Sequence, residues 1–380
     1  MRGSVRQRGE KWEYVVDIPP SNGRPRQQKR KGGFDSERAA EKALNKLLYE
    51  IDQGLVKNSG GITVEKFLER FIEDYAETNV KPKTLDSYKD TVKNLKEGLG
   101  KLKLDQLKTH DIQAFLSKLL KDKQKSNTTI RYYYNVLNIA LNIGITWGLL
   151  AVNPCKGVIP PKKNETEITV LNKKEADQLL EYLNGKPLFL PVYLSLKTGM
   201  RRGEILGLQW SDLKGNTLYV KNQLQIIEKE YVLTSPKSKY GKRSIELDDM
   251  TVHLLKDIRK QQMMNQKVYK DNYWKKYNLI VCWPDGSPYR PDFPTHSLPN
   301  AIESLNKALK EKQQNQLPIV RFHDLRHTHA TLLLEMGVPV KVVTERLGHS
   351  STTVTMDLYA HVTSNMQKET INKIKEIFTI

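Results

Sequence analysis

The chain has 380 residues and a formal net charge of +19 at pH 7, which favours a polyanionic partner over an acidic small molecule. Its length predicts two or three domains. Two cysteines exclude a disulfide framework and suit a reducing cytosol. No stretch approaches the ~20 apolar residues of a membrane span, and the opening MRGSVRQRGEKW lacks the apolar core of a signal peptide. We therefore expect a cytoplasmic location.

The first 31 residues hold nine Lys or Arg, in three segments that alternate like short strands: SVRQRG, KWEYVVDI and RQQKRKGGF. Asp35 or Ser36 then caps a helix with an apolar stripe from Ala40 to Ile51, which Gly54 ends. One sheet face is expected to stay free and basic, and such a ribbon can enter a DNA major groove. The alternative is a solvated basic face on an accessory domain. The DNA contacts expected here are Arg6, Arg8, Trp12, Tyr14, Arg26, Lys29, Arg30 and Lys31.

After the linker signal NSGGI, residues 63–150 read as four helices. Thr84 is expected to cap the helix that runs through Leu95, and Thr109 the next one. The tyrosines of RYYYN are more typical of helix packing than of base stacking. NPCKGVIPPKKNETE reads as a connector. Phosphate contacts are expected from the lysines of this block, Lys81, Lys83, Lys123 and Lys125.

A third region begins at Leu171, where Asn172 and Glu175 form a capping box. The stretch NTLYVKNQLQIIEKEYVLTSPKSKYGKRSIEL predicts three strands, with a lysine-bearing turn between the last two. DDMTVHLLKDIRKQQMMNQ and SLPNAIESLNKALKEK predict helices on either side of an irregular loop. The tail SNMQKETINKIKEIFTI has helical spacing and packs either on its own domain or on a neighbouring protomer.

Residues 321–361 hold five of the eight histidines. His323 and Arg326 are three residues apart, so they share one face of a helix that ends at Gly337. Pro339 suits the first turn of a second helix closed by Gly348, and a third helix carries Tyr359. Arginine is a bidentate phosphate donor, neutral histidine can move protons, and tyrosine can be a covalent nucleophile. The segment therefore suggests chemistry on a phosphate.

The upstream motif TGMRRGE at 198–204, H-x-x-R at 323–326, L-G-H at 347–349 and a tyrosine ten residues later together resemble the tyrosine recombinase (phage integrase) family, in particular integrases of Gram-positive phages and conjugative transposons. The resemblance implies that Arg201, Arg326 and His349 hold the scissile phosphate and that Tyr359 is the nucleophile. His323 would handle the tyrosine proton or help to hold the phosphate. It also implies a catalytic lysine on a hairpin turn, where Lys239 fits best and Lys237 second.

The same resemblance implies a multidomain α+β fold. Residues 1–57 would be an arm-site DNA-binding domain with three strands and a helix. Residues 62–160 would be a four-helix core-binding (SAM-like) domain, and residues 168–380 a mainly α catalytic domain with a small antiparallel sheet.

In function, the family resemblance implies a site-specific DNA recombinase of a mobile element in a bacterial cell. Its 3′-phosphotyrosyl intermediate keeps the bond energy, so neither ATP nor a metal cofactor is required. The partners implied are core and arm attachment sites, a homotetramer with exchange of C-terminal helices, an excision factor and a host DNA-bending protein.

Two other interpretations account for parts of the same sequence. GVPVKVVTERLGHSSTTVTMDLYAH could form a helix-turn-helix in a non-catalytic DNA-binding regulator. HDLRH, residues 323–327, echoes the H-E-x-x-H metal helix of metallopeptidases, but aspartate replaces the glutamate base and Arg326 lies between the two histidines. The joint occurrence of the active-site positions favours the recombinase over both.

Overall fold

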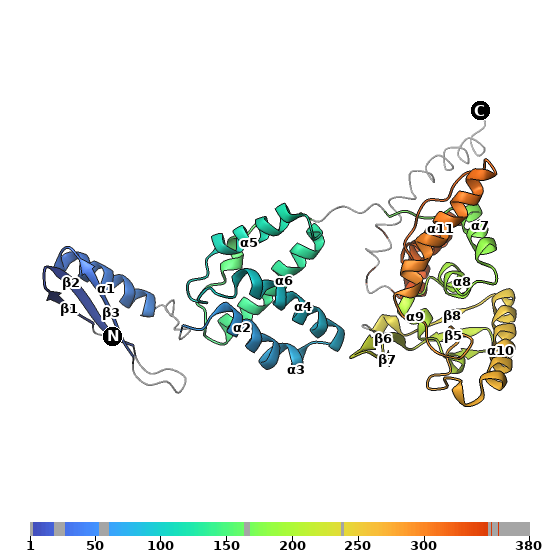
Figure 1. The fold of residues 1–380 in the computed structure, drawn as a ribbon, viewed down its shortest axis with the longest axis horizontal. Helices are drawn as coiled ribbons and strands as arrows, with labels where there is room; N and C mark the ends of the chain where they lie inside the picture. The colour runs from blue at the N-terminus through green and yellow to red at the C-terminus, as the bar shows by residue number, and fades with distance from the viewer. Residues whose placement is uncertain are drawn as a thin grey trace. The chain divides into compact units, whose positions relative to one another are not determined.

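The computed structural model describes residues 3–18, 27–52, 61–162, 168–236, 239–348, 351 and 356, with only the backbone at 18, 27, 29, 50–52 and 239. The chain divides into two compact units, Met1–Glu165 and Thr166–Ile380. The predicted mixture of helical regions and small antiparallel sheets is confirmed (Figure 1). None of the described helices is long and apolar enough to cross a bilayer.

The N-terminal part is an antiparallel sheet with one helix on it (Figure 1). The backbone N–H of Ala39 donates to Ser36 Oγ at 3.2 Å, so Ser36 is the residue that caps the helix. The expected helix end at Gly54 lies outside the described residues. The elements are β1 (Gly3–Arg8), β2 (Lys11–Ile18), β3 (Gln27–Phe34) and α1 (Glu37–Asp52).

One expected DNA contact in this sheet is wrong. Tyr14 is 4% exposed and packs with Val16 against Leu44 and Leu47 of α1. Successive strand residues point to opposite faces, so the side chain of Tyr14 lies on the covered face. Trp12, two residues earlier, is half-buried.

The helical part of the first unit has a core of its own, formed by residues such as Phe67, Leu95, Leu137 and Leu141. Its first helix passes without interruption through a π-helical turn. The elements are α2 (Val64–Arg70), η1 (Phe71–Ala76), α3 (Glu77–Asn79), α4 (Pro82–Leu99), α5 (Thr109–Asp122), α6 (Asn127–Thr146) and the short 3-10 helix η2 (Pro154–Gly157).

Both caps predicted for α4 and α5 are wrong. Helix α4 begins at Pro82, because proline lacks a backbone N–H and its fixed φ suits the first helical position, and it runs to Leu99. Before α5, the carboxylate of Asp111 accepts the backbone N–H of Lys108 at 2.9 Å. The hydroxyl of Thr109 instead donates to the carbonyl of Pro154 at 2.8 Å.

The start of the expected connector is part of the helical core. Asn153 is 1% exposed, and its amide nitrogen donates to the side-chain oxygens of Asn138 and Asn142, each at 2.8 Å. Its own oxygen accepts from the backbone of Cys155, which is fully buried. A buried amide with its hydrogen bonds satisfied fixes this segment on α6, so a freely extended connector cannot begin at residue 153.

The second unit packs helices around two small sheets, β4-β5-β8 and β6-β7. The predicted capping box is present, with Asn172 and Glu175 each accepting the other's backbone N–H. The helices are α7 (Lys173–Leu183), α8 (Phe189–Thr198), α9 (Arg202–Leu206), α10 (Asp249–Tyr269), α11 (Phe293–Glu311), α12 (Asp324–Glu335) and α13 (Val340–Leu347). The 3-10 turns are η3 (Trp210–Asp212), η4 (Lys239–Gly241) and η5 (Lys270–Asn272). The strands are β4 (Leu213–Lys214), β5 (Thr217–Val220), β6 (Gln223–Ile227), β7 (Glu230–Thr234) and β8 (Arg243–Glu246).

The predicted pairing of the last strands is wrong. Glu228 and Lys229 both have positive φ, 50° and 70°, a conformation typical of a tight two-residue hairpin turn. This turn closes β6 and β7 into their own hairpin, and β8 returns to pair with β5. The segment that carries Lys239 therefore joins two different sheets and is not the turn of a hairpin.

Candidate active site

The end of helix α8 positions the first expected arginine. Gly199 ends this helix in the left-handed conformation, with φ of 66°, and Arg201 directly precedes α9. A Cβ atom at Gly199 would lie 2.5 Å from Leu347 and 2.6 Å from His329. Only glycine allows this backbone conformation together with so close an approach. The turn thus brings Arg201 next to helices α12 and α13.

A buried glutamate holds the side chain of Arg201. Glu204 is 2% exposed, and its carboxylate accepts from Arg201 Nη1 and Arg243 Nη2, each at 2.9 Å. Burial acts to raise the pKa of Glu204, but hydrogen bonds and positive charge from Arg243 and Arg201 lower it overall. The carboxylate is therefore ionised at neutral pH and fixes both guanidinium groups. Sequence reasoning missed Arg243, although a buried acid in the TGMRRGE motif signals that a second cation is needed.

Arg326 of α12 is a buried cation with an unused hydrogen-bond donor. The residue is 2% exposed, and its Nη1 donates to the carbonyl of Gly199 at 2.6 Å. Its Nη2 is buried without a hydrogen-bond partner in the described part of the chain. Burial, and then the charges of Arg201 and Arg243, lower the pKa of Arg326 to about 9, so the group remains protonated at neutral pH. An unsatisfied buried donor on a cation is costly, and an anionic oxygen would satisfy it.

His323 lies at the N-terminus of α12. Burial, and then the charges of His327 and Arg326, lower the pKa of His323 to about 4. The imidazole is therefore neutral at pH 7 and can accept one proton or donate one hydrogen bond. The charge of Arg201 also acts on His323. The structure thus brings together three of the expected site residues, Arg201, His323 and Arg326.

His329 connects the elements that carry these residues. Its Nδ1 lies 2.7 Å from the carbonyl of Leu196 in α8, and its Nε2 lies 3.3 Å from Arg346 Nε in α13. A carbonyl can only accept a hydrogen bond and a guanidinium can only donate one. Nδ1 of His329 therefore carries the proton, and Nε2 accepts. Burial is the main reason that the pKa of His329 is lowered to about 4. These contacts give His329 a structural role, since they join α12 to α8 and α13.

The C-terminus of α13 is bound to the same cluster. The carbonyl of Gly348 accepts from Arg201 Nη2 at 3.1 Å, and the carbonyl of Arg346 accepts from Arg243 Nε at 2.6 Å. Cations are favourable here because the last carbonyls of a helix lack partners within it. The chain therefore leaves α13 directly at the arginine cluster.

The remaining expected catalytic residues are only partly described. His349 and Tyr359 lie outside the described residues, together with the third helix and the tail. Lys239 opens the short 3-10 turn η4, but its side chain is not described, and Lys237 lies outside the described residues. The choice between the two lysines stays open.

Most of the expected DNA contacts lie at the surface. Arg6, Arg8, Arg30 and Lys31 are exposed on the N-terminal sheet, and Lys81, Lys83 and Lys123 are exposed in the helical part. Lys125 is half-buried, with its ammonium group 5.8 Å from the centroid of the Tyr133 ring. Tyr133 itself is 6% exposed, which agrees with helix packing. Arg26 and the side chain of Lys29 lie outside the described residues.

Among the described residues, the two histidines of HDLRH have no third metal ligand beside them. The rings of His323 and His327 are perpendicular, with centroids 4.9 Å apart. The carboxylate of Asp324 is bound by Arg321 at 2.9 Å. Across the described ranges, no group of three or more His, Cys, Asp or Glu residues could hold a metal ion. Both cysteines, Cys155 and Cys282, are free thiols.

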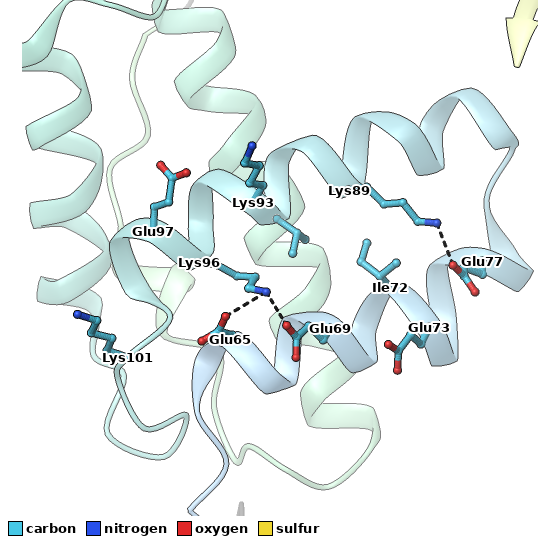
Figure 2. Close-up of a pocket in the computed structure, with 11 residues that line it drawn as sticks. Glu65, Glu69, Ile72, Glu73, Glu77, Lys89, Lys93, Lys96, Glu97 and Lys101 are labelled. Atoms are coloured by element: carbon cyan, nitrogen blue, oxygen red, sulfur yellow. Dashed lines mark hydrogen bonds and ion pairs between the residues drawn. The ribbon is translucent and has the colours of Figure 1, made fainter. Parts of the chain in front are cut away.

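A groove of about 650 Å³ lies elsewhere, between the first helix of the helical part and α4 (Figure 2). Ion pairs cross it: Lys96 Nζ lies 3.0 Å from Glu65 and also bonds Glu69, and Lys89 Nζ lies 3.0 Å from Glu77 (Figure 2). Such exposed pairs contribute only about 0–1 kcal/mol each. The five glutamates and four lysines that line the groove leave it almost neutral, and none of the expected catalytic residues lines it.

Arg201 and Arg243 around a buried carboxylate, a neutral histidine, and a buried guanidinium with a donor that no described residue accepts make this a positively charged site whose chemistry suits an anionic oxygen. The sequence model of the phage integrase family matches residues 169–366, more than half of the chain, and the chain belongs to this family. It is therefore a tyrosine-type site-specific recombinase. The models of the phage integrase N-terminal SAM-like domain and of an arm DNA-binding domain match residues 63–120 and 4–51. The family predicted from the motifs is confirmed, and the helix-turn-helix regulator is not favoured.

Among similar proteins, the tyrosine recombinase XerC-like protein of Caldanaerobacter subterraneus is 28% identical over 369 residues, which cover 90% of each chain. The Tn1549 transposon integrase, solved in complex with transposon right end DNA, matches 82% of this chain and 99% of its own, with 22% identity and a TM-score of 0.67. A lambda integrase tetramer bound to a Holliday junction matches 94% of each chain, with 18% identity and a TM-score of 0.59. These two structures share the fold.

Proposed function

We propose that this chain is the integrase of a phage or conjugative element, which cuts and rejoins duplex DNA at attachment sites through the phenol of Tyr359. The observation that carries the proposal is the buried Arg326 guanidinium, whose Nη2 has no partner in the described part of the chain and which lies near Arg201 and His323. A non-bridging phosphate oxygen supplies the acceptor that this nitrogen lacks.

In the proposed cleavage, the Tyr359 oxygen bonds to phosphorus and the bond from phosphorus to the 5′-oxygen breaks. Arg201 and Arg326 stabilise the negative charge on the non-bridging oxygens, and His349 donates to them. Neutral His323 accepts the phenol proton or holds the phosphate. Lys239, or Lys237 in its place, protonates the leaving 5′-oxygen. The phosphotyrosyl bond keeps the energy of the phosphodiester, so rejoining needs no nucleotide cofactor.

The domain division supports the use of two kinds of DNA site. We propose domains at 1–57, 62–160 and 168–380, since the arm, SAM-like and integrase models each match inside one of them. The first would bind arm sites, while the other two would bind the core site. The lambda integrase tetramer bound to a Holliday junction supports a tetramer on DNA here. Exchange of C-terminal helices, an excision factor, a host DNA-bending protein and a cytoplasmic location are proposed from the family alone.

The test is the substitution Tyr359→Phe, which removes one oxygen and little volume. The variant is incubated with a nicked duplex from the junction between the element and its host, and the products are separated on a denaturing gel. The native protein should give a covalent protein–DNA band, while the variant should bind the duplex and give no such band. A covalent band that persists in the variant would show that another residue is the nucleophile.

A further inference from the structure

The open face of the N-terminal sheet has a glutamate at its centre. Glu13 lies on the middle strand β2 and faces away from α1, since its neighbour Tyr14 packs on that helix. Its side chain is nevertheless only 6% exposed, whereas those of Arg6 and Arg8 are 55% and 80% exposed. The carboxylate therefore lies beneath the arginines of the neighbouring strand β1.

Each carboxylate oxygen of Glu13 has a different arginine. Oε1 accepts from Arg6 Nε at 2.6 Å, and Oε2 lies 3.7 Å from Arg8 Nη1. The hydrogen bond from Arg6 is the first cause of the lowered pKa of Glu13, to which the charge of Arg30 on β3 also contributes. Gly32 lies opposite on β3, and a Cβ atom there would be 3.3 Å from the Cβ of Glu13. The glycine therefore leaves the carboxylate room beside that strand.

A carboxylate in this position weakens attraction to DNA, because it offsets a positive charge and repels phosphates. The advantage of the carboxylate is that it fixes the orientation of the Arg6 side chain. Arg6 bonds Glu13 through Nε, and no described residue accepts from its two Nη nitrogens, which can serve as the fork that fits O6 and N7 of guanine. An arginine that is already held in place loses less conformational freedom on binding.

We infer that Glu13 is a positioning residue that directs Arg6 towards a guanine edge in the major groove of duplex DNA, and so increases sequence discrimination at the expense of general affinity. This inference rests on the proposed arm-binding function of residues 1–57. Its partner is a duplex with guanine at the contacted positions.

The test compares Glu13→Gln with Glu10→Gln in the full-length protein. Glu10 is exposed in the turn between β1 and β2, so its substitution removes the same charge without touching the arginines. The probes are duplexes selected from a random-sequence pool by the native protein, kept only if Arg6→Gln weakens their binding, and scrambled duplexes of the same composition. Dissociation constants are measured by fluorescence anisotropy over a range of salt concentrations.

Both variants should bind scrambled DNA more tightly than the native protein does. Glu10→Gln should keep the ratio of scrambled to selected dissociation constants, whereas Glu13→Gln should lower the ratio at least about fivefold, because each oriented arginine fork contributes that much or more. A freed arginine that binds phosphate should also steepen the log–log salt dependence for selected DNA by about 0.9. An unchanged ratio in Glu13→Gln would overturn the inference and leave the DNA-binding function intact.

Two further variants complete the test. Glu13→Asp keeps the charge but withdraws the carboxylate by one methylene, so it should lower the ratio without tightening binding to scrambled DNA. If Glu13→Gln does not fold, an unchanged ratio in Glu13→Asp overturns the inference. If neither Arg6→Gln nor Arg30→Gln weakens binding to any selected duplex, the open face does not bind DNA, and the proposed function of the domain falls together with the inference.

Discussion

Replacing Glu204 with glutamine should destabilise the second unit without changing its shape. The carboxylate receives three N–H groups, from the Arg201 backbone at 3.0 Å and from the Arg201 and Arg243 side chains at 2.9 Å. Removing one member of a buried ion pair costs about 3–5 kcal/mol. The Arg201 side chain is 39% exposed, so solvent screens its ion pair, and we expect the free energy of unfolding to fall by about 3 kcal/mol. Most of this loss comes from the ion pair with Arg243, whose side chain is 7% exposed. For a unit of this size that corresponds to a decrease in Tm of about 6–12 °C.

The measurement is thermal unfolding at pH 7 followed by circular dichroism, with Glu303→Gln as the control. Glu303 is exposed on α11, and its substitution should change stability by no more than about 0.5 kcal/mol. Because the folded pKa of Glu204 is below its ordinary value of 4.5, its contribution is present above that pH and is lost as the pH falls further. The difference between native and variant Tm should therefore shrink below pH 4. A variant as stable as the native protein at pH 7, or a difference that acid leaves unchanged, would refute the reasoning.

Two more outcomes follow from the site. The pKa of His329 falls from 6.5 to about 4 on folding, so the unfolded chain binds more protons between these values and stability should fall as the pH drops from 6.5 to about 4, by up to about 3 kcal/mol. Urea unfolding at pH 7 and pH 5 should show a smaller loss for His329→Gln, and an equal loss would contradict the assignment. Lys239→Ala should slow cleavage strongly, while a substrate with a 5′-bridging sulfur should restore the rate, because a thiolate leaves without a proton. If this substrate does not rescue Lys239→Ala but does rescue Lys237→Ala, the general acid is Lys237.

The local features of the catalytic unit could be predicted because each has a short-range cause. Gly348 closes α13 as the sequence predicts, in the left-handed conformation that glycine adopts readily. The capping box at Asn172 is likewise a pattern of four residues. Three expected site residues, Arg201, His323 and Arg326, lie on these local elements, which is why motif spacing located them.

What the sequence did not predict depends on contacts between distant segments. The pairing of β5 with β8 encloses the β6–β7 hairpin, and no local pattern distinguishes it from pairing between β7 and β8. Arg243 enters the site only through that pairing, since it is the first residue of β8. Tyr14 was placed on the wrong sheet face because alternation groups residues by face without showing which face the helix covers.

The positive charges of the site repel one another without DNA, and the same charges would stabilise a bound phosphate. Three guanidinium groups, those of Arg201, Arg243 and Arg326, act on one another around the single carboxylate of Glu204. Burial, and then repulsion by Arg201 and Arg243, lower the pKa of Arg326 to about 9, so the described residues hold more positive charge there than their acids neutralise. In the proposed complex, a phosphodiester would bring the missing negative charge and an acceptor for Nη2 of Arg326, which has none among the described residues. The same charges that make this region unfavourable without DNA are therefore those that would stabilise a phosphate, and more strongly the added charge of its transition state.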